Sequence, residues 1–308
     1  MNKKVAITSE FFGRFSKKGE EILKEAGLEV IPNPYEKFLN EEEILSLVDE
    51  ADAIICDLEE ITKKVIDNAP NLKIIARRGV GVDSVDVEYA RENDIKVART
   101  LGVVEKPVAE LVMSYILEIY RKITPLYQAM KKGDWDKILG NSLEGKVLGI
   151  VGLGNIGQEL VRKAKVFDLD IIYTDYNRKE ELETELGIEY VSFKELMKKS
   201  DIISIHVPLT DSTRNMFNYE TMELMEKEPV LINTARGPVV NGEDLAKALE
   251  EGLVSYAAID VFDEEPKTDS PLKNYDNAIL TPHVGTYTEE VFIKMDILAA
   301  ENVVDYLK

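Results

Sequence analysis

The sequence is poor in cysteine, tryptophan, histidine and positive charge. Its 308 residues include one Cys, one Trp and two His, and 38 Lys and Arg stand against 58 Asp and Glu, for a net charge of −20. A single cysteine excludes an internal disulfide. Cys56 ends the apolar segment Ala53-Ile54-Ile55-Cys56, so we expect it to be a core residue. The acidic balance argues against nucleic acid or an anionic membrane as a partner.

Long apolar segments are also missing. No apolar run approaches the roughly 18 residues that a membrane-spanning helix needs. The start, Asn2-Lys3-Lys4-Val5-Ala6-Ile7, is a charged strand start rather than a signal peptide. We therefore expect a cytoplasmic protein without a membrane partner, and we expect no metal site. The hydrophobic share of 44% is that of an ordinary globular protein, and the length suits about two domains.

A glycine-rich fingerprint lies in the middle of the chain. Residues 147–157 read Val-Leu-Gly-Ile-Val-Gly-Leu-Gly-Asn-Ile-Gly, so Gly152, Gly154 and Gly157 follow an apolar strand and open a helix. The first glycine permits a tight turn, the second lets the backbone approach a pyrophosphate, and the third lets helix and strand pack closely. Asp175 ends the next apolar strand, where an acid binds the adenosine ribose. The pattern predicts a dinucleotide site that prefers NAD.

Short apolar strands alternate with helical patterns on both sides of the fingerprint. Strands are expected near 4–8, 28–32, 52–56, 73–76 and 95–98, and again near 147–151, 170–174, 202–205, 230–233, 255–259 and 278–280. Such alternation is typical of α/β folds with parallel sheets. Residues 105–132 instead form one long helical stretch, which Pro125 is expected to kink or break. The tail, 287–308, is an amphipathic helix.

The position of the fingerprint predicts how the domains are built. A parallel sheet that starts near residue 145 is complete before the last helix, which is free to return to the first domain. We therefore expect an α/β fold of two doubly wound parallel-sheet domains. A Rossmann nucleotide domain, 100–286, is inserted into a discontinuous flavodoxin-like substrate domain, 1–99 and 287–308. Two chain crossings at one hinge suit a cleft that opens and closes.

Two histidines and one arginine follow strands of the second sheet. Reduction of a carbonyl by a nicotinamide needs a proton donor and an anchor for the substrate, and ligands bind beyond the carboxyl ends of such strands. We prefer His283, at the last strand and close to the hinge, as the acid/base. His206 lies in what we take as the adenine half of the sheet, where it can also be a packed loop residue. Arg236 can grip a carboxylate bidentately, or it can cap a surface turn.

A carboxylate is expected beside the proton carrier. It would orient the ring of His283 and stabilise the imidazolium. Several acids follow strand 255–259, and spacing alone does not separate Asp260, Asp263, Glu264 and Glu265.

A second glycine-rich turn follows the strand near 73–76. It reads Arg77-Arg78-Gly79-Val80-Gly81, and its backbone N–H groups can form an anion-binding nest to which the arginines add positive charge. The alternative is an ordinary tight turn with two solvated arginines.

Together these segments resemble the D-isomer-specific 2-hydroxyacid dehydrogenases over nearly the whole chain. The motifs that carry the resemblance keep the order and spacing of the family: Arg77 to Asp83, Val108-Ala109-Glu110, Trp135 and Gly145-Lys146 before the fingerprint, His206-Val-Pro-Leu-Thr, Asn233-Thr-Ala-Arg-Gly, Asp260-Val-Phe with Glu265-Pro266, and Pro282-His283-Val-Gly. A lone G-x-G-x-x-G is weak evidence, but motifs in this order are specific. The resemblance implies an NAD-dependent enzyme that transfers hydride between C2 of a 2-hydroxy acid and nicotinamide.

The resemblance also assigns roles. It implies that Arg236, Glu265 and His283 are the catalytic set, and it selects Glu265 because the family's glutamate directly precedes the proline. The substrate contacts that it implies are Arg77, Arg78, Gly79, Val80 and Gly81, to which we add Arg99 as a further cation that can face the cleft or point away. The cofactor neighbours that it implies are Thr100, Gly152, Gly154, Asn155, Ile156, Gly157, Asp175, His206, Val207, Pro208, Thr234, Ala235, Asp260 and Gly285. A homodimer through the long helix near 105–132 is implied as well.

Within the family, the Arg-x-Gly-x-Gly-x-Asp turn is most similar to D-3-phosphoglycerate dehydrogenase, an enzyme of serine biosynthesis, in a short form without a regulatory domain. Three cations, Arg77, Arg78 and Arg99, favour a doubly anionic substrate. The chain departs from the family at Arg99-Thr100-Leu101, where Asn-Thr-Pro is usual, so glyoxylate, hydroxypyruvate and other 2-keto acids stay open. A rival interpretation is an NAD-sensing binding protein without turnover, against which the intact Arg/Glu/His set argues.

Overall fold

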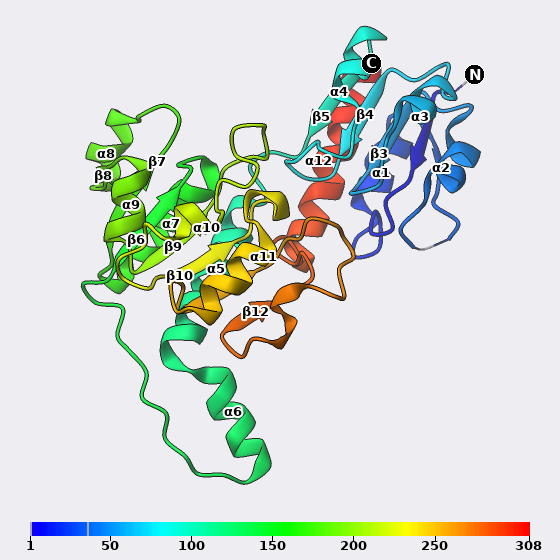
Figure 1. Cartoon of the computed structure of the whole chain (residues 1–308). Coiled ribbons are helices and arrows are strands. Elements are labelled where there is room, and N and C mark those ends of the chain that lie inside the picture. Colours follow the sequence, from blue (N-terminus) through cyan, green and yellow to red (C-terminus); the bar gives the residue numbers. More distant parts are fainter. Residues whose placement is uncertain (1, 36) are drawn as a thin grey trace. The chain divides into compact units, whose positions relative to one another are not determined.

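The computed structural model describes residues 2–35 and 37–308, which form two compact units (Figure 1). The outer unit consists of Met1–Val104 and Thr286–Lys308, and the nucleotide unit is Glu105–Gly285. The nucleotide unit is thus inserted into the sequence of the outer unit. Every expected strand is present, and its bounds differ from the expectation by at most one residue at either end.

The outer unit is built on a parallel sheet with the strand order β2-β1-β3-β4-β5. This order turns back at β1, as in flavodoxin-like sheets. The strands are β1 (Lys4–Ile7), β2 (Glu29–Ile31), β3 (Ala53–Cys56), β4 (Ile74–Arg77) and β5 (Lys96–Arg99). The helices are α1 (Lys18–Glu25), α2 (Glu41–Val48), α3 (Lys63–Asp67), α4 (Val87–Glu92) and α12 (Glu289–Leu307).

Apolar clusters lie on both faces of the outer sheet, because its central strands are apolar on both sides. Ile44 of α2 belongs to the cluster on one face, and Leu23 of α1 and Val303 of α12 belong to the cluster on the other. Cys56, at the end of β3, is fully buried, as expected. The last helix of the chain therefore completes a face of the sheet that the first residues begin.

The nucleotide unit holds a second parallel sheet, with the strand order β12-β11-β10-β9-β6-β7-β8. Its strands are β6 (Val147–Val151), β7 (Asp170–Thr174), β8 (Glu189–Tyr190), β9 (Ile202–Ile205), β10 (Val230–Asn233), β11 (Tyr256–Ile259) and β12 (Ala278–Leu280). Its α-helices are α5 (Glu105–Arg121), α6 (Ile123–Lys132), α7 (Asn155–Ala164), α8 (Glu180–Leu186), α9 (Phe193–Lys199), α10 (Tyr219–Met222) and α11 (Gly242–Glu250). Short 3-10 helices lie at Lys165–Phe167, Gly237–Val239 and Pro271–Asn274.

This strand order is that of the Rossmann fold. The order reverses between β6 and β9, and the crevice at such a reversal is where doubly wound sheets bind ligands. The expected α/β fold with two doubly wound parallel sheets is confirmed. The edge strand β8 was not expected, because two residues are too short to give a period in the sequence.

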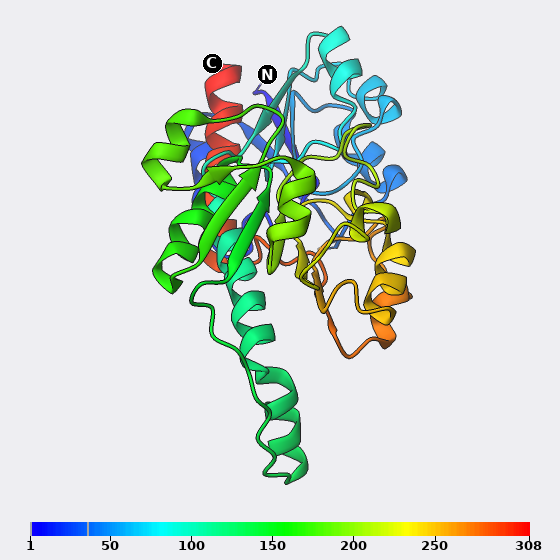
Figure 2. The same cartoon turned by 60° about the vertical axis from the view of Figure 1, so that its left-hand side comes forward.

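The long helical stretch is broken earlier than we expected. α5 ends at Arg121, and Lys122 takes a left-handed backbone conformation with φ of +54° before α6 starts. Pro125 lies inside the first turn of α6, where a missing N–H costs no intrahelical bond. α5 packs on α7, whereas α6 buries no residue and extends away from the sheet of its own unit (Figure 2). None of the helices in the described residues has the length and apolar character that a bilayer crossing requires.

Candidate active site

The nucleotide unit brings the three predicted catalytic residues to one edge of its sheet. Arg236 follows β10, Glu265 follows β11 and His283 follows β12, and these strands are neighbours. His283 Nδ1 lies 2.6 Å from Glu265 Oε2. This distance is that of a short, charge-assisted hydrogen bond. The carboxylate fixes the orientation of the ring and leaves Nε2 as the nitrogen that can face a substrate.

Glu265 is held in its ionised form. Burial on its own would raise its pKa, but the hydrogen bond and charge of His283, the Phe262 N–H and the charge of Arg236 outweigh burial and lower the pKa below its ordinary value. The Phe262 N–H donates to Glu265 Oε1 at 2.9 Å, so both carboxylate oxygens are engaged. A fixed negative charge beside the ring stabilises an imidazolium.

Gly237 lets the loop with Arg236 approach the loop after β11. A Cβ atom on Gly237 would lie 1.9 Å from the carbonyl carbon of Phe262, so any side chain would push the two loops apart. Arg236 is half-buried and donates from Nη1 to the Ala235 carbonyl at 2.7 Å. Asn233 shapes the turn, since it accepts from the Ala235 N–H and donates to the Arg236 carbonyl. Nothing in the sequence marks Asn233 beyond its place in the motif Asn233-Thr-Ala-Arg-Gly.

His283 is held in a strained backbone conformation. Its φ is +52°, a left-handed value that costs a residue with a side chain about 1–3 kcal/mol. The His283 N–H donates to the Asp260 carbonyl at 2.8 Å. The Asp260 carboxylate, 1% exposed, accepts from the N–H groups of Val284 and Gly285 at 2.8 and 2.9 Å and from the hydroxyl of Thr281. Asp260, predicted as a cofactor neighbour, thus orders the segment that presents His283.

The glycine fingerprint forms the turn between β6 and α7. Gly152 has φ of +98°, and a Cβ atom there would lie 2.9 Å from the carbonyl carbon of His206. A Cβ atom on Gly157 would lie 2.5 Å from the Gly152 carbonyl oxygen. Around Gly154 a Cβ atom would meet nothing within 4 Å, which leaves open space before the N-terminus of α7. Each glycine therefore has the geometry that the fingerprint predicts.

Asp175 and a lysine that we did not predict lie at the glycine turn. Asp175 Oδ2 accepts from the Leu153 N–H at 2.8 Å. Lys179 Nζ lies 3.5 Å from the same oxygen and donates to the Leu153 carbonyl at 2.6 Å. Arg178 bonds both carboxylate oxygens of Glu183, at 2.7 and 2.8 Å. Strand periodicity ends before this loop, so no sequence signal separates Lys179 from Arg178.

His206 does not lie where we expected. It follows β9, and β9 lies on the far side of β6 from β7 and β8. Placing it in the adenine half was wrong, because the order reverses at β6 and groups β9 with β10 to β12. His206 Nε2 lies 2.9 Å from Ser204 Oγ, and burial lowers the pKa of His206 to about 4. The ring is therefore neutral near pH 7, which favours His283 as the acid.

The second glycine turn lies in the outer unit, directly after β4. Gly79 has φ of +143°, and a Cβ atom there would lie 1.7 Å from Arg77 Nη1, so the arginine side chain crosses the turn. Arg77 Nη1 also donates to the Arg78 carbonyl. Within the described residues, the N–H groups of Val80 and Gly81 donate no hydrogen bond, so they can receive an anion.

Two of the three cations expected to meet a second anion are occupied. Arg77 and Arg78 are buried, and carboxylates of their own unit pair with them, Asp57 with both and Asp296 with Arg78. The expectation that these guanidinium groups offer free charge to a substrate is wrong, because a desolvated cation persists only with its partners. Arg99 is exposed, as a substrate cation would be.

Comparison with known proteins gives the family. Residues 113–285 match the family model described as D-isomer specific 2-hydroxyacid dehydrogenase, NAD binding domain. The chain belongs to this family. A glyoxylate reductase of Thermococcus litoralis is 41% identical over 275 residues, which cover 86% of this chain and 83% of the relative. This dehydrogenase is therefore an NAD-dependent oxidoreductase that acts on the CH–OH group of donors, and the non-catalytic alternative is set aside.

Two further relatives are similar to this dehydrogenase over most of its length. A D-3-phosphoglycerate dehydrogenase of Methanocaldococcus jannaschii is 40% identical over 274 residues, which cover 88% of this chain but 52% of the relative. The crystal structure of a glyoxylate reductase from Paecilomyes thermophila matches with a TM-score of 0.88 at 30% identity and covers 98% of this chain and 94% of that one.

The nucleotide unit of the dehydrogenase fits a dinucleotide. The open space at Gly154, before the N–H groups of Asn155 and Ile156, suits a pyrophosphate. Thr234 Oγ1 is buried and has no hydrogen-bond partner among the described residues, and a bound ligand would satisfy such an atom. Asp175 Oδ1 makes one hydrogen bond, with the Asn177 N–H at 3.4 Å, and can accept from a ribose hydroxyl.

The remaining predicted cofactor residues fall into two places. Val207 and Pro208 follow β9. A Cβ atom on Gly152 would lie 2.9 Å from Val207 N, so this loop runs beside the glycine turn. Thr100 belongs to the outer unit, where its N–H donates to the Gly79 carbonyl at 3.0 Å and its buried Oγ1 has no partner in the described part of the chain. No cluster of His, Cys, Asp and Glu suited to a metal ion occurs among the described residues.

Proposed function

We propose that this dehydrogenase reduces a small 2-keto acid with one carboxylate, such as glyoxylate or hydroxypyruvate, to the 2-hydroxy acid. The observation that carries the proposal is the burial of Arg77 and Arg78 in ion pairs. With both occupied, the outer unit retains one backbone nest for one carboxylate. The relatives named glyoxylate reductase agree with a substrate of this size.

The catalytic residues divide the work of the reduction. The hydride that reaches C2 comes from the bound nicotinamide. Arg236 binds the substrate carboxylate and polarises the adjacent carbonyl. His283, as the imidazolium, gives its Nε2 proton to the carbonyl oxygen, so that C=O becomes CH–OH. Glu265 stabilises the imidazolium before transfer, and the N–H groups of Val80 and Gly81 bind the carboxylate.

The proposal is tested with a panel of 2-keto acids. Glyoxylate, hydroxypyruvate, pyruvate and 3-phosphohydroxypyruvate are assayed for NADH oxidation, and kcat/KM is compared. We expect the highest value for glyoxylate or hydroxypyruvate. A higher value for 3-phosphohydroxypyruvate would contradict the proposal, and so would the absence of turnover with all four.

A second candidate is oxidation of 3-phosphoglycerate, which would place the chain in serine biosynthesis. The similarity to the relative of that name favours it, and Arg99 is an exposed cation whose Nη1 lies 3.5 Å from the Val80 carbonyl. If Arg99 binds a phosphate, Arg99→Ala should cost about 1.5–3 kcal/mol with 3-phosphohydroxypyruvate and much less with hydroxypyruvate. High salt should weaken the binding of 3-phosphohydroxypyruvate more than the binding of hydroxypyruvate. Equal losses for the two substrates would exclude this role of Arg99.

We also propose that a second copy of the chain covers α6 and residues 133–141. This arm carries exposed apolar side chains, of which Tyr127 is 61%, Trp135 77% and Leu139 93% exposed. Apolar groups of this size rarely stay in water together. Sedimentation of the wild type should show a dimer, and Trp135→Asp with Leu139→Asp should give a monomer. A wild-type monomer at micromolar concentration would contradict the proposal.

A further inference from the structure

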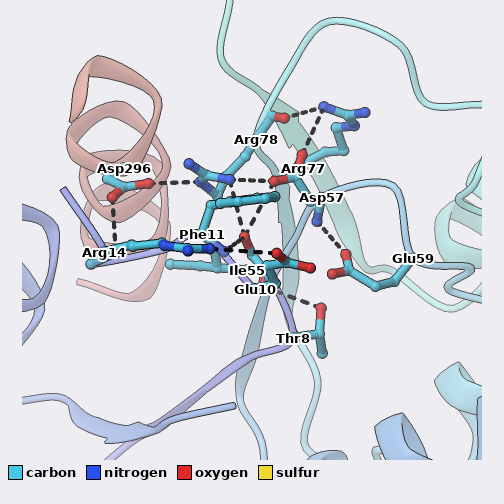
Figure 3. A network of polar contacts seen from close by, with 12 residues as sticks. Thr8, Glu10, Phe11, Arg14, Ile55, Asp57, Glu59, Arg77, Arg78 and Asp296 are labelled. Carbon is cyan, nitrogen blue, oxygen red and sulfur yellow. Dashed lines mark hydrogen bonds and ion pairs between the residues drawn. The ribbon is translucent and has the colours of Figure 1, made fainter. Parts of the chain in front are cut away.

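A fully buried arginine lies beneath the turn that the proposed function assigns to the substrate carboxylate. Arg78 Nε donates to Asp296 Oδ1 of α12 at 2.7 Å, and Nη1 donates to Ser9 Oγ at 3.0 Å and to Asp57 Oδ2 (Figure 3). Three segments of the outer unit besides its own therefore meet at one guanidinium: the loop after β1, the end of β3, and α12.

Asp296 is the deepest partner in this network. Burial raises its pKa, and Arg78 and the Gly13 N–H, which donates to Oδ2 at 2.9 Å, offset only part of that effect. A buried carboxylate of this kind needs its cation. The pair therefore ties the turn after β4 to the last helix of the chain more firmly than a surface ion pair would.

Apolar contacts hold the turn from the other side. Val80 and Phe11 pack against the buried cluster that contains Phe292. The Phe292 ring stacks on Phe11, with 5.1 Å between centroids, and the Arg78 guanidinium lies 5.5 Å from the Phe292 centroid. The Gly79 carbonyl accepts from the Thr100 N–H at 3.0 Å. The backbone that presents the free N–H groups is thus fixed before any substrate arrives.

We propose that Arg78 is a positioning residue. It does not touch the substrate, and it holds the Val80 and Gly81 N–H groups in the orientation that receives the carboxylate. The inference rests on the proposed function of this turn. It replaces the direct role that the sequence had suggested for Arg78 with a role exerted through the backbone.

Two variants of the full-length protein separate positioning from folding. Arg78→Lys keeps the buried charge but lacks the planar fork that bonds Asp57 and Asp296 together. The pair Arg78→Leu with Asp296→Leu removes both charges, a change that buried ion pairs often tolerate. Asp57 keeps the Ser9 hydroxyl at 3.3 Å and the Arg77 guanidinium at 3.7 Å as partners.

Ile44→Ala is the matched control. Ile44 is fully buried in the cluster on the opposite face of the outer sheet, so its truncation lowers Tm without touching the Arg78 network. In both Arg78 variants we expect the KM for glyoxylate and the inhibition constant of oxamate to rise about tenfold, with kcat within about twofold and the Kd of NADH unchanged. Ile44→Ala should leave all four values at those of the wild type.

Amide hydrogen exchange keeps the two proposals apart. The N–H groups of Gly79 and Thr100 donate to the carbonyls of Arg77 and Gly79, so their exchange reports on the order of this turn. It should accelerate in Arg78→Lys and stay unchanged in Ile44→Ala, whether or not the panel of keto acids shows turnover. Wild-type exchange at this turn in both Arg78 variants would overturn the positioning role while leaving the proposed function intact. A KM that rises equally in Ile44→Ala would also overturn it, since loss of stability alone would then explain the effect.

Discussion

The carbonyl of Asp260 accepts the backbone N–H of His283, and the carboxylate of the same residue accepts the next two backbone N–H groups. One buried residue after β11 thus fixes the left-handed backbone of His283, the proposed proton donor, after β12. Preorganisation of this kind is what a general acid needs, because a displacement of about 1 Å can cost on the order of 10²-fold in rate.

Asp260→Asn should therefore lower kcat by about tenfold or more. The asparagine offers one oxygen and an NH₂ group where two N–H donors converge, so one of them loses its acceptor. Asp263→Asn is the matched control, because Asp263 is an exposed acid of the same loop. Steady-state kinetics with saturating NADH would decide, and equal kcat values in the two variants would contradict this role of Asp260.

The proton carrier itself gives the second prediction. His283→Ala should cut kcat by about 10²–10⁴ with little change in NADH affinity, and His206→Ala should cost far less. Glu265→Gln removes the charge that favours the imidazolium, so the alkaline limb of the pH profile for reduction should move to lower pH. Glu264→Gln should leave the profile in place. A profile that stays fixed in Glu265→Gln would show that the observed hydrogen bond plays no part in the proton transfer.

Cofactor choice gives the third prediction. Asp175 repels a 2′-phosphate, so NAD should be preferred over NADP by at least about tenfold in kcat/KM. Asp175→Ser should narrow that preference, because the carboxylate is gone and Lys179 stays at the glycine turn. Adding Lys179→Met to Asp175→Ser should then lower kcat/KM for NADP. Arg178→Ala in the same background is the control, since Arg178 is engaged by Glu183. If the activity with NADP fell in the control alone, Arg178 rather than Lys179 would be the cation that binds the 2′-phosphate.

The titration of Glu59 should lower the free energy of unfolding as pH rises. Burial, with the negative charge of Asp57 next to it, raises the pKa of Glu59 to about 7. An acid with a higher pKa in the folded than in the unfolded protein favours folding at low pH, and this contribution is lost as pH rises from about 4.5 to 7. The full loss amounts to about 3 kcal/mol.

Denaturant unfolding of the wild type and Glu59→Gln at pH 5 and pH 8 measures this contribution. Glutamine cannot ionise, so the free energy of unfolding should fall by about 2.5 kcal/mol less in the variant between the two pH values, since part of the full loss occurs below pH 5. A constant cost of the buried amide cancels in this difference. The same pH dependence in both proteins would show that Glu59 does not titrate in this range.

The convergence of the proposed catalytic residues could be predicted from strand periodicity. Arg236, Glu265 and His283 lie in the loops that follow three strands marked by apolar runs, and a parallel sheet brings such loops to one edge. Periodicity does not select Glu265 among the four acids after β11, and only the resemblance to the family does so. The break at Lys122 could not be predicted, since lysine carries no turn signal and Pro125 drew the break toward itself.

The state of the arginines could not be predicted for a different reason. Arg77 and Arg78 look like free cations because the acids that pair with them are distant in the sequence: Asp57 is 21 positions from Arg78 and Asp296 is 218. Local pattern shows where a turn falls but not which distant side chain neutralises its charge. Lys179 was missed for another reason, since its partner Asp175 is only four positions away but the loop after β7 has no period that fixes its path.

The Arg78–Asp296 ion pair also sets an order of assembly during synthesis. A ribosome adds about 5–20 residues per second, so about 10–40 seconds separate the appearance of Arg78 from that of its partner 218 positions later. The whole nucleotide unit is made within that interval, while the outer sheet lacks α12 on one face. The outer unit is thus the first part of the chain to be started and the last to be completed.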